Sequence, residues 1–110
     1  MNKNSVNVLG TEYEIRTNEE IGKDLLSIGR DAECDLYAKV INLMDKDQIR
    51  DGGAESKINY WNSILRHEII HAFFFESGLD CYSQDEKLVD FIALQFPKLK
   101  KLFEEVGCDD

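Results

Sequence analysis

Apolar and polar positions alternate in the first part of the chain, which is typical of half-buried β-strands. Val6 and Val8 alternate with polar residues before Gly10, and Tyr13 and Ile15 do so after it. Two alternating segments joined through a glycine predict a β-hairpin.

The middle of the chain predicts one more strand between two loops. Residues 17–34 are polar and rich in Glu, Asp and Gly, which indicates a loop with at most one helical turn, around residues 24–28. Residues 36–44 combine β-branched and aromatic side chains over the length of a strand, and their mixed polarity favours the edge of a sheet. The charged segment 45–55 contains two adjacent glycines and is expected to be a second loop.

A long helix is expected next. Ser56 can cap a helix that runs to about Ser77, and Gly78 is a suitable C-terminal stop. The segment is apolar on almost every side, which predicts that the helix is buried at the centre of the domain.

Two shorter helices are expected after it. Ser83 can cap a helix over residues 84–96, which Pro97 ends, and a short amphipathic helix then runs to Gly107. Three strands followed by three helices predict one α+β domain over residues 1–110. In this prediction the helices cover one face of a small, antiparallel, three-stranded sheet.

The chemistry of the chain is concentrated on the long helix, where residues 65–71 read Leu-Arg-His-Glu-Ile-Ile-His. His67 and His71 are four residues apart, so both imidazoles lie on one helix face and can bind one Zn²⁺. Glu68 lies beside the metal, where it can hold a water as general base, as in an H-E-x-x-H motif. Two histidines at this spacing also occur by chance, but burying three ionisable side chains without a metal is unfavourable. We therefore expect one zinc ion per chain.

Catalytic zinc usually has three protein ligands and a water, and the chain has only two histidines. A carboxylate is therefore the expected third ligand, and the nearby candidates are Glu76, Asp80, Asp85, Glu86 and Asp90. Glu86 and Asp90 share one face of the following helix. We assign Glu86 as the ligand and Asp90 as the acceptor of the far N–H of a ligating histidine, with the reverse assignment left open.

Two other interpretations of these residues stay open. Glu86 is also the last residue of a possible capping box that begins at Ser83, which would explain it without a metal. A structural Cys₂His₂ site would use Cys81 with Cys34 or Cys108, although the spacing of these cysteines is scattered.

Charge and cysteine content narrow the functional classes. The formal net charge of −9 repels phosphate backbones and anionic lipid, so we expect no nucleic-acid and no membrane partner. There is no apolar leader-like segment and no apolar run long enough to span a bilayer. The number of cysteines is odd, at three. These features predict a cytoplasmic protein with free thiols.

The segment HEIIHAFFFESGL followed by DEKLVDFIALQFPKL resembles gluzincin-type zinc peptidases, in which a Glu on a later helix completes the HExxH site. The second segment is similar to the E-x-x-A-[ND]-x-F-A pattern of the ImmA/IrrE-like peptidases. Glu86, Asp90 and Ala93 match that pattern, whereas Val89 replaces an Ala and the aromatic residue is shifted by one. The whole chain, including NVLGTEYEI, resembles small metallopeptidase-like proteins of phages and prophages of Gram-positive bacteria.

The resemblance implies a minimal zincin-like fold with His67, His71 and Glu86 as zinc ligands and Glu68 as the catalytic base. The expected function is hydrolysis of a peptide bond in a peptide or protein substrate. The resemblance also implies that the edge of a strand around residues 37–43 binds an extended peptide. We expect Tyr82, in the loop between the two ligand helices, to stabilise the oxyanion.

Tyr60 and Arg66 are the other candidates for that role. A different class of function is a non-catalytic protein that is stabilised by zinc and acts by binding a host protein. The Glu68 carboxylate favours catalysis over this alternative, because a purely structural zinc site has no use for it. Zinc-dependent hydrolysis of a non-peptide bond is a third hypothesis, and the negative charge disfavours polyanionic substrates.

Overall fold

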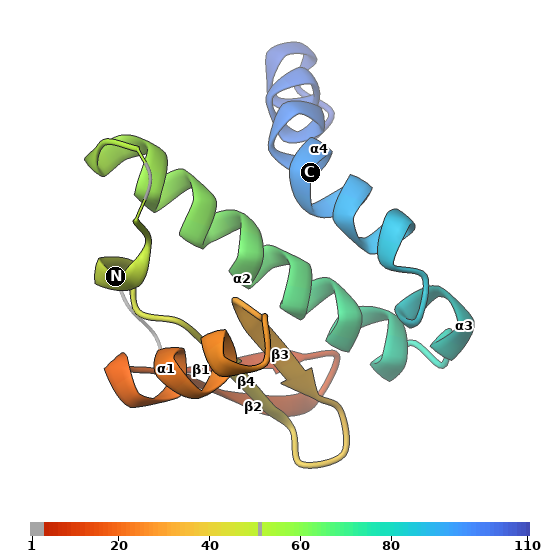
Figure 1. Cartoon of the computed structure of the whole chain (residues 1–110). Coiled ribbons are helices and arrows are strands. Elements are labelled where there is room, and N and C mark those ends of the chain that lie inside the picture. Colours follow the sequence, from red (N-terminus) through yellow and green to blue (C-terminus); the bar gives the residue numbers. More distant parts are fainter. Residues whose placement is uncertain (1–3, 51) are drawn as a thin grey trace.

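A computed structural model describes residues 4–50 and 52–110 as an α+β fold. In chain order the elements are β1 (Ser5–Val8), β2 (Thr11–Thr17), α1 (Glu19–Ser27), β3 (Ala32–Asp35), β4 (Val40–Leu43), the 3₁₀ turn η1 (Lys46–Gln48), α2 (Ala54–Glu76), α3 (Asp80–Ser83) and α4 (Glu86–Val106). The strands form one sheet in the order β1-β2-β4-β3. The long helix α2 crosses one face of the sheet, and the first half of α4 packs on α2 from the other side (Figure 1).

The predicted N-terminal hairpin is confirmed. β1 and β2 are antiparallel, with Val6 opposite Tyr13. Gly10 has a φ of 96°, which glycine adopts without strain, and its N–H donates to Asn7 Oδ1 at 2.8 Å. The alternation places the Tyr13 side chain in the core, where it is fully buried.

The predicted three-stranded antiparallel sheet is wrong, because the sheet has four strands and is mixed. β2 and β4 are parallel neighbours, with Ile15 opposite Ile41. A parallel pair needs a long crossover rather than a hairpin turn, and the segment between residues 17 and 34 supplies it as α1 and β3. β4 is therefore an interior strand rather than the edge strand that its mixed polarity suggested, and β3 lies at the edge.

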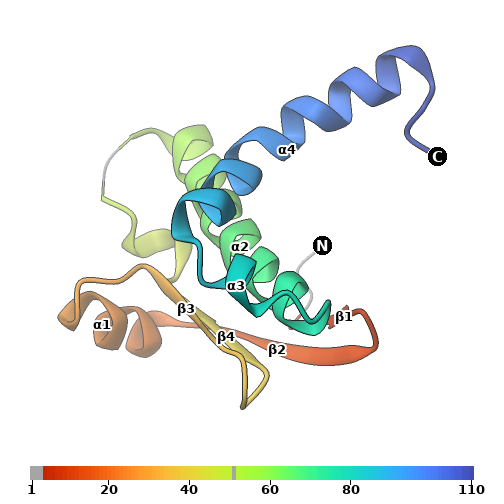
Figure 2. The same cartoon turned by 90° about the vertical axis from the view of Figure 1, so that its right-hand side faces the viewer.

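The loop predicted over residues 17–34 is wrong, because most of this segment forms helix α1 and strand β3. Asn18 begins the helix by accepting a hydrogen bond from the Ile21 N–H at 2.8 Å. Helix α1 lies on the face of the sheet opposite α2 (Figure 2), and its residue Leu25 is buried. Gly22 is packed so closely that an added Cβ would lie 1.7 Å from Gln48 Oε1. Gly22 therefore lies inside a helix and against the Gln48 side chain, and it does not mark a loop.

The strand expected over residues 36–44 is confirmed only in its second half. Residues 36–39 form the turn between β3 and β4 instead. The Asp35 carboxylate holds this turn by accepting hydrogen bonds from the Tyr37 and Ala38 N–H groups at 3.1 and 2.9 Å.

Helix α2 begins at Ala54 with Gly53 as its N-cap, three residues before the cap predicted at Ser56, and Gly78 lies just beyond its end with a φ of 79°. Its inner face packs on the sheet through Trp61 and Ala72, and the Trp61 Nε1–H donates to Met44 O at 2.8 Å. Burial on all sides is not observed, because Ile58, Tyr60 and Phe73 on other faces are exposed by 43–47%. α2 is therefore a covering layer of the sheet rather than a central helix.

The prediction of two C-terminal helices separated at Pro97 is wrong. One helix, α4, continues through Pro97 and ends at Gly107, which has a φ of 73°. Proline has no N–H, so the carbonyl of Ala93 loses its helical donor. The Arg66 Nε–H of α2 donates to that carbonyl at 2.8 Å, which replaces the hydrogen bond that the proline removes. The second half of α4 projects away from the body of the protein (Figures 1 and 2). None of the helices in the described ranges is long and apolar enough to cross a membrane.

Glu76, at the end of α2, is the main polar link between the helix and the sheet. Its carboxylate accepts hydrogen bonds from Tyr13 Oη at 2.6 Å, Lys39 Nζ at 2.8 Å and Thr11 Oγ1 at 2.9 Å. The hydrogen bonds from Lys39 and Tyr13 lower the pKa of Glu76 from 4.5 to about 2. The ionised carboxylate therefore stabilises the fold above about pH 4.5, and this stability is lost as the pH falls towards 2.

We expect Glu76→Gln to lower the melting temperature at pH 7 and to remove most of the loss of stability between pH 4.5 and 2. Thermal unfolding followed by circular dichroism from pH 2 to pH 7 measures both effects. Glu12→Gln, an exposed position on β2, is the matched control and should behave as wild type. An unchanged pH dependence in Glu76→Gln would show that this carboxylate does not link the helix to the sheet.

Candidate metal centre

The structure brings His67, His71 and Glu86 together. Nε2 of His67 and Nε2 of His71 are 3.1 Å apart, because one helical turn places both rings on the same face of α2. The Glu86 carboxylate lies 2.7 Å from the His71 nitrogen and 3.2 Å from the His67 nitrogen. In tetrahedral zinc sites with bonds of about 2.1 Å, neighbouring ligand atoms are about 3.4 Å apart. The three side chains thus converge closely enough to offer one ligand atom each to a single metal ion.

Each imidazole has a partner on its far side. His71 Nδ1 lies 2.5 Å from the carbonyl oxygen of Ser83. A carbonyl can only accept, so Nδ1 carries the proton and Nε2 presents its lone pair to the metal position. His67 Nδ1 lies 3.4 Å from the Asp90 carboxylate, which is the orienting place predicted for Asp90.

Ser83 contacts the candidate centre in a way that the sequence does not predict. It was expected to cap the second ligand helix, but the capping residue is Asp85, which accepts from the Leu88 N–H at 3.1 Å. The buried Ser83 hydroxyl donates instead to the His71 carbonyl at 2.9 Å. The capping box is therefore absent, and Glu86 is left to face the histidines. No local signal identifies this role, because it depends on a backbone carbonyl brought in by α3.

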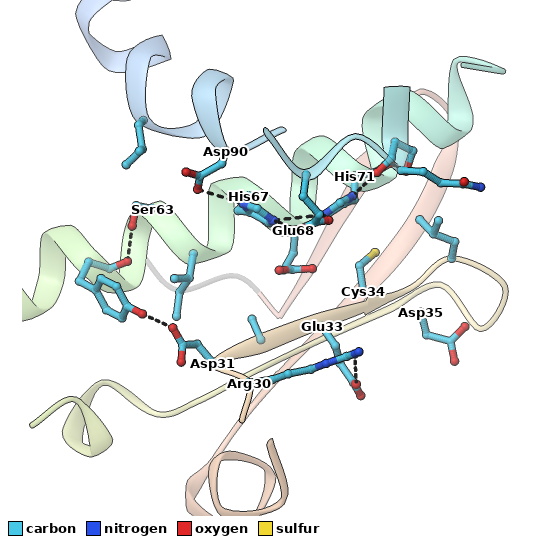
Figure 3. A pocket seen from close by; sticks show the side chains of 18 of the residues that line it. Arg30, Asp31, Glu33, Cys34, Asp35, Ser63, His67, Glu68, His71 and Asp90 are labelled. Carbon is cyan, nitrogen blue, oxygen red and sulfur yellow. Dashed lines mark hydrogen bonds and ion pairs between the residues drawn. The ribbon is translucent and has the colours of Figure 1, made fainter. Parts of the chain in front are cut away.

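Glu68 is more buried than the three candidate ligands His67, His71 and Glu86, with 9% of its surface exposed. Its carboxylate points from α2 towards β3 (Figure 3), and no hydrogen bond reaches it from the described residues. Burial raises the pKa of the Glu68 carboxyl well above its usual range. The His67 side chain opposes the rise and the Glu86 carboxylate adds to it. A carboxyl with a pKa nearer neutrality is suited to accept and return a proton.

The centre opens into a cleft of about 1200 Å³ between α2, the edge strand β3 and the start of α4 (Figure 3). Acidic side chains outnumber Lys and Arg in its lining, and the one Lys or Arg among the lining residues is Arg30. The acidic residues are Asp31, Glu33, Asp35, Glu68, Glu86 and Asp90. The strand edge beside the centre belongs to β3, residues 32–35, and not to the predicted segment 37–43.

The three candidates for oxyanion stabilisation lie in different surroundings. Tyr82 is 47% exposed, its ring packs edge-on against Phe74 at 5.7 Å, and it is not among the residues that line the cleft. Tyr60 lines the cleft and donates to Asp31, and this hydrogen bond raises the pKa of Tyr60 to about 12. Arg66 is engaged with the carbonyl of Ala93. Of the three, Tyr60 is the one that lines the cleft.

The remaining ligand candidates have other partners. Glu76 binds the sheet, Asp85 caps α4, and Asp80 accepts from Gln84 Nε2 at 2.9 Å. The three cysteines are free, and within the described residues none belongs to the group of converging ligand atoms. The Cys₂His₂ alternative is therefore not supported. Cys34 lines the cleft, and burial raises the pKa of its thiol to about 12.

Comparison with known proteins identifies no relative of this chain. No protein-family model matches the chain, and neither a curated protein nor a solved structure matches it. The site is therefore classified by its geometry alone. It is a candidate His-His-Glu metal centre beside a buried glutamate, in an α+β fold.

Proposed function

We propose that the protein is a zinc-dependent peptidase in which Glu68 is the general base. The observation that carries the proposal is the convergence of three ligand atoms within 4.8 Å of one another, beside a buried carboxylate, at the floor of a cleft. Two neutral imidazoles and one carboxylate are a donor set typical of catalytic zinc. The gluzincin resemblance of residues 65–93 agrees with this donor set.

In the proposed mechanism each residue of the site has a separate role. His67, His71 and Glu86 would hold the zinc, which when bound supplies a Lewis acid and acidifies water. Glu68 takes a proton from the attacking water and passes it to the leaving amine. The Ser83 carbonyl and Asp90 keep the imidazoles in the orientation for binding.

The proposed substrate is an extended peptide that lies along β3. This strand pairs only with β4 within the described chain, so its outer edge has backbone groups free for another strand. Free thiols at Cys34, Cys81 and Cys108 favour the cytoplasm as the compartment of the activity.

The acidic lining of the cleft predicts a preference among peptides. Three carboxylates at Asp31, Asp35 and Asp90 lie on the cleft around the centre. We expect the zinc-loaded protein to cleave peptides with Lys or Arg near the scissile bond about tenfold faster than acidic ones at low salt, since focused charge raises association rates. Digestion of a mixed peptide library, read by mass spectrometry, measures this ratio. No cleavage of any peptide would contradict the peptidase proposal, and cleavage without a charge preference would contradict only the substrate class.

A zinc-stabilised binding protein is the second candidate function, and one observation favours it. The projecting half of α4 exposes a row of apolar side chains, each by 41–77%: Leu99, Leu102, Phe103 and Val106. An apolar helix face of this kind is common at protein–protein interfaces. Such a protein would have no need of an ionisable group at Glu68, which separates the two functions experimentally.

A further inference from the structure

Pro97 leaves one carbonyl of α4 without its normal helical partner. The amide that would bind the carbonyl of Ala93 belongs to residue 97, and proline has no N–H. The proline ring also crowds the carbonyl four residues earlier and pushes it away from the helix axis. The oxygen is therefore available to a donor from another element.

Arg66 provides that donor from α2. Its Nε–H donates to Ala93 O at 2.8 Å, and Ala93 itself is almost fully buried between the helices. Arg66 directly precedes His67 in sequence, so the contact is made one residue from a proposed zinc ligand.

The contact completes a row of polar interactions between α2 and α4. Glu86 in the first turn of α4 reaches both histidines, and Asp90 in the second turn reaches His67. The carbonyl of Ala93 in the next turn meets Arg66. Beyond this point α4 leaves the body (Figure 1), so the Arg66 contact is the last polar link before the helix projects into solvent.

We propose that Arg66 is a positioning residue for the metal centre: through the carbonyl that Pro97 leaves free, it holds α4 so that Glu86 faces His67 and His71. The inference rests on the proposed metal site. Without this contact the apolar packing at Val89 and Ala93 remains, but α4 is less restrained against rotation about its own axis, and such a rotation moves the Glu86 carboxylate relative to the imidazoles. Changes in groups that orient metal ligands typically weaken metal binding by 10–100-fold.

Zinc affinity of the full chain, measured by competition with a chromophoric chelator, tests the proposal. We expect Arg66→Ala to weaken zinc binding about tenfold and to alter the visible spectrum of the Co²⁺-substituted protein. Arg66→Lys, which keeps a donor, should recover part of the loss. Arg50→Ala, at an exposed arginine, is the matched control and should bind as wild type. Wild-type affinity and spectrum in Arg66→Ala would overturn the proposal.

Pro97→Ala separates positioning from general stability. An alanine restores the helical N–H and draws the Ala93 carbonyl back towards the axis, in competition with Arg66. We expect a melting temperature at least as high as wild type together with weaker zinc binding, and no further weakening when Pro97→Ala is added to Arg66→Ala. Tighter or unchanged zinc binding in Pro97→Ala would overturn the role of the proline.

Hydrogen exchange in the metal-free protein makes the result independent of the proposed function. Arg66→Ala should speed amide exchange across residues 86–96, whereas Arg50→Ala should not. If wild type binds no zinc, the peptidase proposal fails while the exchange result still decides whether Arg66 holds α4. Unchanged exchange in Arg66→Ala would refute that role.

Discussion

Glu68→Gln is expected to keep one zinc per chain and to lose peptide hydrolysis by about 10²–10⁴-fold. Glutamine has nearly the same shape, and residue 68 lies outside the group of ligand atoms formed by His67, His71 and Glu86. What the substitution removes is the ability of a buried, unpartnered carboxylate to accept a proton. Zinc content by mass spectrometry and rates on a peptide from the library digest measure the two properties separately.

Glu33→Gln is the matched control, because Glu33 lines the same cleft but is engaged by Asn42 Nδ2 at 3.2 Å and lies near Arg30. It should retain zinc and most of the activity. Full activity in Glu68→Gln would remove the general base from the mechanism. An intact biological effect of Glu68→Gln in cells would favour the binding function over the enzymatic one.

The second large effect is the dependence of stability on zinc. A ligand that binds only the folded state stabilises it by RT ln(1 + [L]/Kd), about 2.7 kcal/mol at a free concentration 100 times Kd. For a domain near this size, such a gain raises the melting temperature by roughly 10 °C. We expect zinc to produce this shift in wild type, a chelator to reverse it, and His67→Ala or His71→Ala to abolish it. Differential scanning calorimetry with and without zinc is the measurement.

Cys81→Ser serves as the control for the identity of the ligands. Cys81 is exposed and lies outside the converging group, so its replacement should leave the zinc-dependent shift intact. A shift that survives His67→Ala but disappears in Cys81→Ser would place the metal elsewhere. No shift in wild type would leave the two imidazoles without a bound cation and would contradict the proposed centre.

Several features of the fold follow from the sequence alone because they depend on short-range geometry. The hairpin at Gly10 needs only alternation and a residue that tolerates positive φ. The convergence of His67 and His71 needs only a helix, since residues four apart share a face. The spacing of Glu86 and Asp90 likewise places both carboxylates on one face of the second helix.

Other features depend on contacts between segments far apart in the chain. The parallel pairing of β2 with β4 and the edge position of β3 arise from the crossover through α1, which the polar composition of residues 17–34 conceals. The sequence shows the cap at Asn18 and an apolar spacing from Ile21 to Leu25, but the burial that stabilises this short helix comes from the sheet.

The candidate metal centre also combines features that the sequence determines with features that only the fold determines. The amino-acid sequence determines which side chains can bind zinc and that two of them share a helix face, because a helix repeats its geometry every turn. Only the tertiary structure decides that Glu86 is released from a capping box, that a Ser83 carbonyl orients His71, and that Arg66 lets α4 continue through Pro97. Each of these three features depends on a backbone atom, and every residue has the same backbone atoms. No pattern of side chains in the sequence therefore predicts them.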